Sequence, residues 1–386
     1  MKVVVYADEF KALASKMKSA VGKGAAFHSL ETVKFVAKNG NISATATDYE
    51  NFLSVALDGR IIEDGTCYID FDTLKKMVVK GDDIVISTGD NNITVNAGKK
   101  SYEILNFDYS DSFPETPKLK VATREATAIS APVLANMKTL SVMASSEEAY
   151  GLMHAIRFDL EKRPSRLIAI DGHRIGIWNL DGVDAMKSFT IGLKCVEILK
   201  NAIGKDSGLI RVACDGKYAA FTGEDFTYIV KCIEGIYYNV DDIINKLLKD
   251  YDYKIRVDNK ELAEIAKEYK KGVSTRDNMS PMMFAFSGSN GAVATAFDFK
   301  TYMTSDKLES VEWKMTKANP KHFCKAINPS FIVDACAFCE ENITIISTFS
   351  EKTPMYMGSG DKEVLVLPVN ICGENNLLAF ALRQAG

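Results

Sequence analysis

The chain has 386 residues, of which 47% are hydrophobic and 25% are charged, a composition typical of a globular protein with two or three domains. Its 47 basic and 51 acidic residues give a formal net charge of −4, which argues against a nucleic-acid partner unless the basic residues gather on one surface. No apolar run is long enough to span a membrane, and the N-terminal segment is too short for a signal peptide. We therefore expect a cytoplasmic protein.

The same order of elements occurs three times along the chain. In the first third, periodicity predicts a helix over residues 8–21, a strand over 44–48, a second helix over 71–80 and a further strand over 83–86. Each third thus reads helix, strands, helix, strands, which argues against most enzymes with a single active site. The equivalent ranges are 130–143, 167–171, 193–203 and 209–212 in the second third, and 258–271, 294–298, 328–339 and 343–346 in the last.

Prolines mark the end of the first repeat. Pro114 and Pro117 interrupt residues 113–117, and proline disfavours helix in the residue before it. The second join is less marked and falls near residues 249–253. We predict three domains, over residues 1–120, 121–249 and 250–371, followed by a C-terminal extension over 372–386.

Lysines recur beside the apolar stripes of the predicted helices. In the first helix Phe10, Leu13 and Met17 share one face, while the lysines lie off it. Solvated helix faces explain such lysines, because the helix dipole favours them near C-termini. If the three repeats bring these faces together, however, they form a basic surface that can follow phosphates. The lysines predicted to form this phosphate-facing surface are Lys11, Lys16, Lys18, Lys75, Lys76, Lys80, Lys138, Lys194, Lys200, Lys267, Lys270 and Lys271.

Three segments, which occur in a fixed order along the chain, resemble segments of a known family. They are residues 170–175 with the turn Asp171-Gly172-His173-Arg174, residues 327–334 with the helix start Asn328-Pro329, and the late strand over 364–369. Together with the three-repeat plan, they resemble the bacterial sliding clamp, the β subunit of DNA polymerase III, over residues 1–371.

The resemblance implies an α+β fold of three similar domains, the DNA-clamp fold, with helices lining a hole and antiparallel sheets outside. Two protomers would form a head-to-tail ring, a homodimer around duplex DNA. The chain would be a non-catalytic processivity factor without cofactor or metal. It would slide without reading sequence and would tether DNA polymerase, the clamp loader and other proteins that carry clamp-binding motifs.

The resemblance also implies two sites. The strand over residues 100–105 would form the dimer interface through Tyr102 and Ile104, although its alternation fits an ordinary core strand equally well. An apolar pocket between the second and third domains would bind partner peptides. Aliphatic residues such as Ile170 and Leu365 also fit strand core, whereas the turn Gly172-His173-Arg174 is hard to place in a core. The implied pocket residues are Met153, Ile170, Gly172, His173, Arg174, Ile175, Ile243, Asn328, Phe331, Pro354, Leu365, Leu367, Pro368 and Val369.

The chain departs from the family pattern at this pocket and at its end. Residues 235–242 and 367–370 lack the positive charges usual in the family, which predicts less acidic partner motifs or a specialised replication system such as that of a mobile element. The tail from Cys372 to Gly386 extends beyond the family's normal end, and its stretch 376–382, an asparagine followed by six apolar residues, is apolar enough to dock. The tail can fray, add a helix on the outer surface, or dock into the pocket itself.

Other functional classes are poorly supported. Asp171 and His173 lack a nucleophile in a Gly-x-Ser-x-Gly elbow, and Gly22-Lys23 lacks the rest of a phosphate loop. The eight cysteines form no dense framework, and Cys336 with Cys339 lies in a predicted helix without a second pair, so we expect reduced, buried thiols. The remaining alternative is a repeat scaffold that binds proteins but not DNA.

Overall fold

The computed structural model describes residues 1–24, 27–120, 126–205, 208–272, 281–287, 290–296, 303–308, 310–315, 323–369, 379–381 and 383–384. The chain divides into two compact units. Unit 1 comprises Met1–Lys138, Asp159–Ser165 and Gly182–Glu234, and unit 2 comprises Thr139–Phe158, Arg166–Asp181 and Gly235–Gly386.

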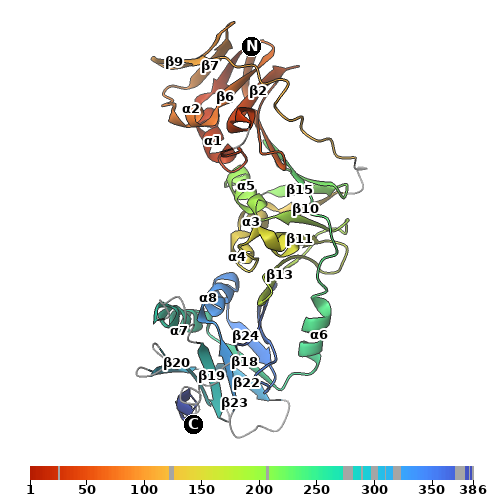
Figure 1. Ribbon diagram of the computed structural model, residues 1–386, viewed down its shortest axis with the longest axis vertical. Coiled ribbons are helices and arrows are strands. Elements are labelled where there is room, and N and C mark those ends of the chain that lie inside the picture. Colours follow the sequence, from red (N-terminus) through yellow and green to blue (C-terminus); the bar gives the residue numbers. More distant parts are fainter. Residues whose placement is uncertain are drawn as a thin grey trace. The chain divides into compact units, whose positions relative to one another are not determined.

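Unit 1 contains two antiparallel sheets (Figure 1). Alternate residues point into the core, so that Val3 and Val5 of the first strand are buried and its even-numbered residues are more exposed. The first sheet has the order β5 (Gly59–Glu63), β1 (Lys2–Tyr6), β7 (Asp83–Thr88), β8 (Asn92–Ala97) and β9 (Lys100–Leu105). The second has the order β10 (Ala126–Ser130), β15 (Leu209–Cys214), β16 (Tyr218–Thr222), β17 (Phe226–Lys231), β4 (Asn51–Leu57), β3 (Asn41–Thr47), β2 (Thr32–Lys38) and β6 (Gly65–Asp70).

The helices of unit 1 bury one apolar face each. In α1 (Ala7–Met17) the predicted stripe Phe10, Leu13 and Met17 is buried. This helix contacts α2 (Phe71–Lys76) and α5 (Lys194–Ile203), and α5 also contacts α3 (Ala131–Ala135), as Figure 1 shows for α1 and α5. Unit 1 also holds the short η1 (His28–Glu31) and β14 (Phe189–Gly192).

The helix predicted over residues 8–21 ends at Met17, and two more predicted helices end early or break in the structure. The helix predicted over residues 71–80 ends at Lys76, after which the chain becomes extended at Met77. The helix predicted over 130–143 breaks at Asn136, whose amide bonds to Pro132 and Val133, and resumes as α4 (Lys138–Ser141). Both breaks are local changes of backbone conformation that the apolar spacing does not encode.

Unit 2 also contains two antiparallel sheets. Pairing of β13 with β26 places Ile175 opposite Leu365, so residues far apart in sequence become neighbours. The larger sheet runs β11 (Ala155–Asp159), β12 (Ser165–Ile170), β13 (Arg174–Leu180), β26 (Lys362–Val366), β25 (Met355–Ser359), β24 (Ile343–Ser347), β18 (Tyr253–Val257) and β22 (Ser310–Met315). The smaller runs β21 (Met303–Leu308), β20 (Asn290–Ala296), β19 (Met282–Ser287) and β23 (Phe323–Ile327).

Two helices of unit 2 lie side by side, α7 (Asn259–Gly272) and α8 (Pro329–Phe338) (Figure 1). Asn328 caps α8, because its side chain accepts a hydrogen bond from the backbone N–H of Ser330 at 2.9 Å. The helix therefore begins where the Asn-Pro motif predicts. The unit also holds the 3₁₀ helix η2 (Glu148–Met153).

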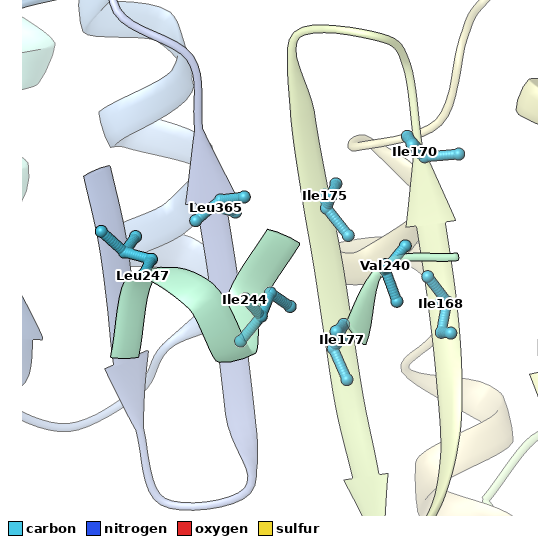
Figure 2. Packing of buried hydrophobic residues seen from close by; sticks show 8 residues of the cluster. All are labelled: Ile168, Ile170, Ile175, Ile177, Val240, Ile244, Leu247 and Leu365. Atoms are coloured by element: carbon cyan, nitrogen blue, oxygen red, sulfur yellow. The ribbon is translucent and has the colours of Figure 1, made fainter. Parts of the chain in front are cut away.

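The helix α6 (Asp241–Lys249) was not predicted from the sequence. Val240, Ile244 and Leu247 recur at helical spacing, and this is the signal that could have identified it. These residues pack against the β12–β13 hairpin and Leu365 of β26 (Figure 2). The cluster shown there comprises Ile168, Ile170, Ile175, Ile177, Val240, Ile244, Leu247 and Leu365.

The predicted order of helix, strands, helix and strands in each third is confirmed by α1 to β9, by α3 to β17 and by α7 to β26. Residues 297 and 298 of the strand predicted over 294–298 lie outside the described residues. The three domain boundaries remain a prediction. Among the helices of the described chain, none is long and apolar enough to cross a membrane.

Most cysteines and a short part of the tail lie within the described residues. Seven cysteines are free and buried, and burial raises the pKa of both Cys336 and Cys339 to about 12, which leaves these thiols protonated and unreactive. Cys372 and Asn370 lie outside the described residues. Residues 379–381 are helical, and Phe380 and Ala381 pack against Met283, Ala285, Cys324 and Ala326 of the smaller sheet.

Candidate functional site

The turn after β12 is held by Asp171 and Gly172. One carboxylate oxygen of Asp171 accepts hydrogen bonds from the backbone N–H groups of His173 and Arg174, both at 2.9 Å. Gly172 has a φ of +87°, a conformation that residues with a side chain rarely adopt. The Asp-Gly pair thus fixes the direction in which His173 and Arg174 leave the sheet.

Arg174 joins this turn to α8. Its Nε donates to Asp171 Oδ2 at 2.8 Å, its Nη1 donates to Asp334 Oδ2 at 2.6 Å, and its Nη2 donates to the carbonyl of Val142. The guanidinium also lies 4.5 Å from the ring centre of Phe331, a cation–π contact. Because all three nitrogens have partners within unit 2, Arg174 serves as a structural clamp rather than as a free cation.

Phe331, His173 and Leu367 meet beside this clamp. The rings of His173 and Phe331 stack with their centres 6.2 Å apart. The backbone N–H of Leu367 donates to the carbonyl of His173 at 2.8 Å, which brings the chain after β26 next to the turn. The Leu367 side chain is 41% exposed, so an apolar group is presented to solvent at this point.

Two hollows open on the same unit. The smaller has a volume of about 280 Å³ and the larger about 640 Å³, and Lys352 lines both. The larger carries two lysines and two aspartates among apolar groups, a mixed lining rather than a basic one. The smaller is lined by Cys324, Ala326, Glu351, Lys352, Leu367, Pro368 and Val369. The larger is lined by Asp242, Ile243, Lys246, Leu247, Asp250, Thr348, Lys352, Thr353 and Pro354.

The predicted pocket residues all lie in unit 2, in four settings. Gly172, His173, Arg174, Phe331 and Leu367 surround the turn, and Leu367 continues with Pro368 and Val369 along the smaller hollow. Ile243 and Pro354 line the larger hollow. The others lie beneath the surface or at its edge: Ile170, Ile175 and Leu365 are buried in the cluster of Figure 2, Met153 packs against that cluster, and Asn328 caps α8.

Sequence reasoning missed the α6 residues and the β24–β25 loop. Lys246, Leu247 and Asp250 went unnoticed because α6 itself was missed, although its apolar spacing was readable. The loop contributes Thr348, Lys352 and other residues to the walls of the hollows. It connects two strands of a β-hairpin, and no sequence motif predicts its length.

Buried Lys325 of β23 was also missed. Its Nζ donates to Ser347 Oγ at 2.7 Å, to the carbonyl of Ser350 at 2.9 Å and to the carbonyl of Thr353 at 2.6 Å. Nothing in the strand pattern distinguishes it from a surface lysine.

Several predicted DNA-facing lysines are engaged in ion pairs. Lys11 lies 3.0 Å from Asp8 and Lys75 lies 2.7 Å from Asp72, both pairs spanning one helical turn. Three more pairs are Lys16 with Asp225, Lys138 with Glu197 and Lys194 with Asp48. Within the described part of the chain, no ion pair is found for Lys18, Lys76, Lys80, Lys200, Lys267, Lys270 and Lys271, which are exposed.

The predicted interface residues lie on β9, the outermost described strand of its sheet. The hydroxyl of Tyr102 accepts a hydrogen bond from the Val78 N–H at 2.9 Å and donates one to the Val78 carbonyl at 3.2 Å. Ile104 is half-buried opposite Ile93. Leu105 and Phe107, which the sequence analysis did not select, are 66% and 54% exposed. An edge strand with exposed apolar residues is suited to pairing with another chain.

The described residues contain no group of three or more histidine, cysteine, aspartate or glutamate side chains arranged to hold a metal ion.

Comparison with known proteins gives a likeness to solved structures. The chain is similar to the DNA polymerase III beta subunit of Thermotoga maritima, with a TM-score of 0.83 and 19% identity, over 96% of this chain and 100% of that one. It is similar to the sliding clamp of Bacillus subtilis, with a TM-score of 0.83 and 16% identity, over 96% and 99%. It is also similar to the Helicobacter pylori beta clamp bound to a DNA ligase peptide, with a TM-score of 0.76 and 16% identity, over 96% and 100%.

No family model and no curated protein matches the sequence. The structural likeness establishes the fold, so the chain has the sliding-clamp fold, and the resemblance seen in the sequence is confirmed at that level.

Loss of Arg174 should destabilise unit 2. Arg174→Ala leaves the half-buried carboxylates of Asp171 and Asp334 without their cation, and we expect a loss of about 2 to 3 kcal/mol in the free energy of unfolding. Arg174→Lys should recover only part of it, because one ammonium cannot reach both carboxylates in the same geometry. Urea unfolding followed by circular dichroism measures the change, with Arg60→Ala on exposed β5 as control. An unchanged midpoint for Arg174→Ala would contradict the clamp role.

Proposed function

We propose that the chain is a DNA sliding clamp. Two copies form a head-to-tail ring that encircles duplex DNA and tethers DNA polymerase, the clamp loader and other proteins. The chain performs no chemistry of its own and acts in the cytoplasm. Three domains, over residues 1–120, 121–249 and 250–371, build each half of the ring. The observation that carries the proposal is the sliding-clamp fold over 96% of the chain, combined with the turn that brings His173, Phe331 and exposed Leu367 together beside two hollows.

Partner peptides bind in unit 2. The exposed Leu367 side chain and the stacked pair His173–Phe331 offer apolar surface, and the hollows beside them add aliphatic groups together with charged and hydroxyl side chains. Such a surface suits a peptide that inserts leucine and phenylalanine side chains. A solved clamp with this fold holds a DNA ligase peptide. Because each guanidinium nitrogen of Arg174 already donates a hydrogen bond within unit 2, binding relies on apolar fit and backbone contacts more than on a free cation at the turn.

DNA is held by the ring and not by base contacts. Lysines without an ion pair are free to contact phosphates and release counterions, whereas a lysine beside an aspartate contributes less. Unit 1 supplies Lys18, Lys76, Lys80 and Lys200 for this role, and α7 of unit 2 supplies Lys267, Lys270 and Lys271. Phosphate contacts of this kind carry no sequence information, as sliding requires.

Ring closure uses two different sheet edges. Among the described strands, β9 is the outermost of a unit 1 sheet, and β21 is the outermost of the smaller unit 2 sheet. Pairing β9 of one copy with β21 of the next satisfies the open backbone groups of both strands. Because the two edges differ, the contact is heterologous, and it closes when the rotation between copies allows.

A protein scaffold that does not bind DNA is the second candidate. It shares the peptide site, and the ion pairs that occupy five of the predicted lysines favour it. The two candidates differ only in what the exposed lysines do.

Truncation at the turn should weaken peptide binding. Leu367→Ala removes an exposed apolar anchor, and we expect the affinity for a labelled peptide with a Leu-Phe pair to fall about 10-fold to 100-fold, or about 1.4 to 2.8 kcal/mol. Phe331→Ala should have a similar effect. Fluorescence anisotropy measures it, and Leu209→Ala, at a side chain 70% exposed in unit 1, is the control. Equal affinities for the Leu367→Ala variant and the control would place the peptide site elsewhere.

Neutralising the unpaired lysines should weaken DNA binding. In one variant Lys18, Lys76, Lys80 and Lys200 become glutamine, and in a matched variant the ion-paired Lys11, Lys75, Lys138 and Lys194 do. Both lose the same charge. The slope of log affinity against log salt should fall by about 1 per lysine in the first variant and by less in the second. Unchanged DNA binding in both, with peptide binding intact, would favour the scaffold.

Charges at the β9 edge should prevent ring closure. Leu105→Asp with Phe107→Asp places carboxylates where a partner strand would pack, and sedimentation velocity should show monomers. Ile62→Asp on β5, at the opposite edge of the same sheet and 53% exposed, should leave dimers intact. Negative-stain averages of the unmodified protein should show closed rings. Solid particles or open arcs well above micromolar concentration would refute the ring.

A further inference from the structure

A buried lysine lies behind the proposed peptide site. Lys325 belongs to β23, and its side chain is 1% exposed. A buried charge is costly unless hydrogen bonds surround it. Nζ donates to Ser347 Oγ at 2.7 Å, to the Ser350 carbonyl at 2.9 Å and to the Thr353 carbonyl at 2.6 Å. An ammonium has three N–H donors, and here each of them has an acceptor.

All three acceptors belong to one connection. Ser347 ends β24, and Ser350 and Thr353 lie in the loop that leads to β25. Ser347 Oγ in turn donates to the Pro354 carbonyl at 2.8 Å, so its proton is already committed and it can only accept from Lys325. The ammonium therefore binds the end of β24 and two carbonyls of the β24–β25 loop.

The same loop forms walls of both hollows. Thr348, Lys352, Thr353 and Pro354 line the larger hollow, and Glu351 and Lys352 line the smaller. Elsewhere the loop is held by Phe349, whose N–H donates to Asp252 Oδ2 at 2.8 Å and whose ring lies 6.0 Å from that of Tyr253. A change in the shape of the loop therefore changes one wall of each hollow.

We propose that Lys325 is a positioning residue for peptide docking, whose ammonium holds the β24–β25 loop in the shape that receives the peptide, so that docking weakens when Lys325 loses its proton. This inference rests on the proposed function of the two hollows. An uncharged amine has two N–H groups for three acceptors, so at least one hydrogen bond to the loop is lost.

The groups around Lys325 place the loss of its proton near neutral pH. Burial lowers the pKa of Lys325 from 10.5 to about 7, although the carboxylates of Asp252 and Glu351 act in the opposite direction. The other titratable neighbours, Cys324 and Tyr253, have pKa values raised by burial and stay uncharged in this range. The protonated fraction of such a group falls from about nine tenths at pH 6 to about one tenth at pH 8.

Stability should respond to pH in the opposite direction from docking. The pKa of Lys325 is about 7 in the fold and 10.5 as the ordinary value, so between these values the unfolded chain binds one more proton. The contribution of Lys325 to the free energy of unfolding therefore rises with pH above 7. A loss of docking with rising pH cannot then be attributed to general unfolding through this group.

The test is a pH titration of peptide affinity. The probe is a blocked peptide with a Leu-Phe pair and no titratable side chain, measured by fluorescence anisotropy from about pH 6 to about pH 8. We expect the affinity to fall about tenfold, in proportion to the protonated fraction. Lys325→Met should bind with the same affinity at every pH.

Two variants serve as controls. Lys362→Met replaces another buried lysine, 7% exposed, which pairs with Glu340 at 2.6 Å and lies over Trp178, and it should keep the pH dependence of the unmodified chain. His173→Gln removes the imidazole of the site and should weaken binding at every pH, but the ratio of the affinities at pH 6 and pH 8 should stay the same.

The outcomes separate the two hypotheses. No binding at any pH would overturn the proposed docking, and the role of Lys325 with it. Binding that is flat with pH in the unmodified chain would overturn only the role of Lys325, as would a Lys325→Met variant that retains the full pH dependence. If Lys325→Met does not fold, the pH profile of the His173→Gln variant decides, because a flat profile there would overturn the role of Lys325.

Discussion

The pairing of β13 with β26 is the interaction on which the candidate site depends. It sets Arg174 opposite Val366 and Ile175 opposite Leu365, and the hydrogen bond from Leu367 to the His173 carbonyl extends it beyond the last strand. Without this register the turn after β12, the chain after β26 and α8 would not converge. A slip of one residue would move every side chain of β26 to the other face of the sheet.

The turn at Arg174 forms a rigid side of the site, and the β24–β25 loop forms an adjustable side. Arg174 ties the turn to α8 through two carboxylates and a ring, so this side has one arrangement. The β24–β25 loop is shaped instead by hydrogen bonds to one buried ammonium and one carboxylate. Polar networks in a low-dielectric interior gain or lose strength together, and a change at Lys325 therefore reaches the whole loop.

The sequence was sufficient for the repeat and for the turn, because both are local patterns. Apolar spacing located α1, α5 and α8 to within a few residues, and glycine between Asp171 and His173 marked the turn. The helix α6 was not predicted because its apolar residues are few and begin within residues 235–242, a segment considered only for its lack of positive charges. The role of Lys325 could not be read at all, since its acceptors lie on another strand and a loop. The ion pairs between Lys194 and Asp48 and between Lys16 and Asp225 likewise join distant residues.

The carboxylates beside the helix lysines bear on motion as well as on affinity. Asp8 and Asp72 each hold a lysine within one turn of helix, and such exposed pairs are weak and exchange readily. In the proposed ring, a phosphate near Lys11 or Lys75 would compete with an aspartate for the same ammonium. Such competition would make these contacts shallow, and a shallow, repetitive energy profile would lower the friction of a protein that diffuses along the duplex.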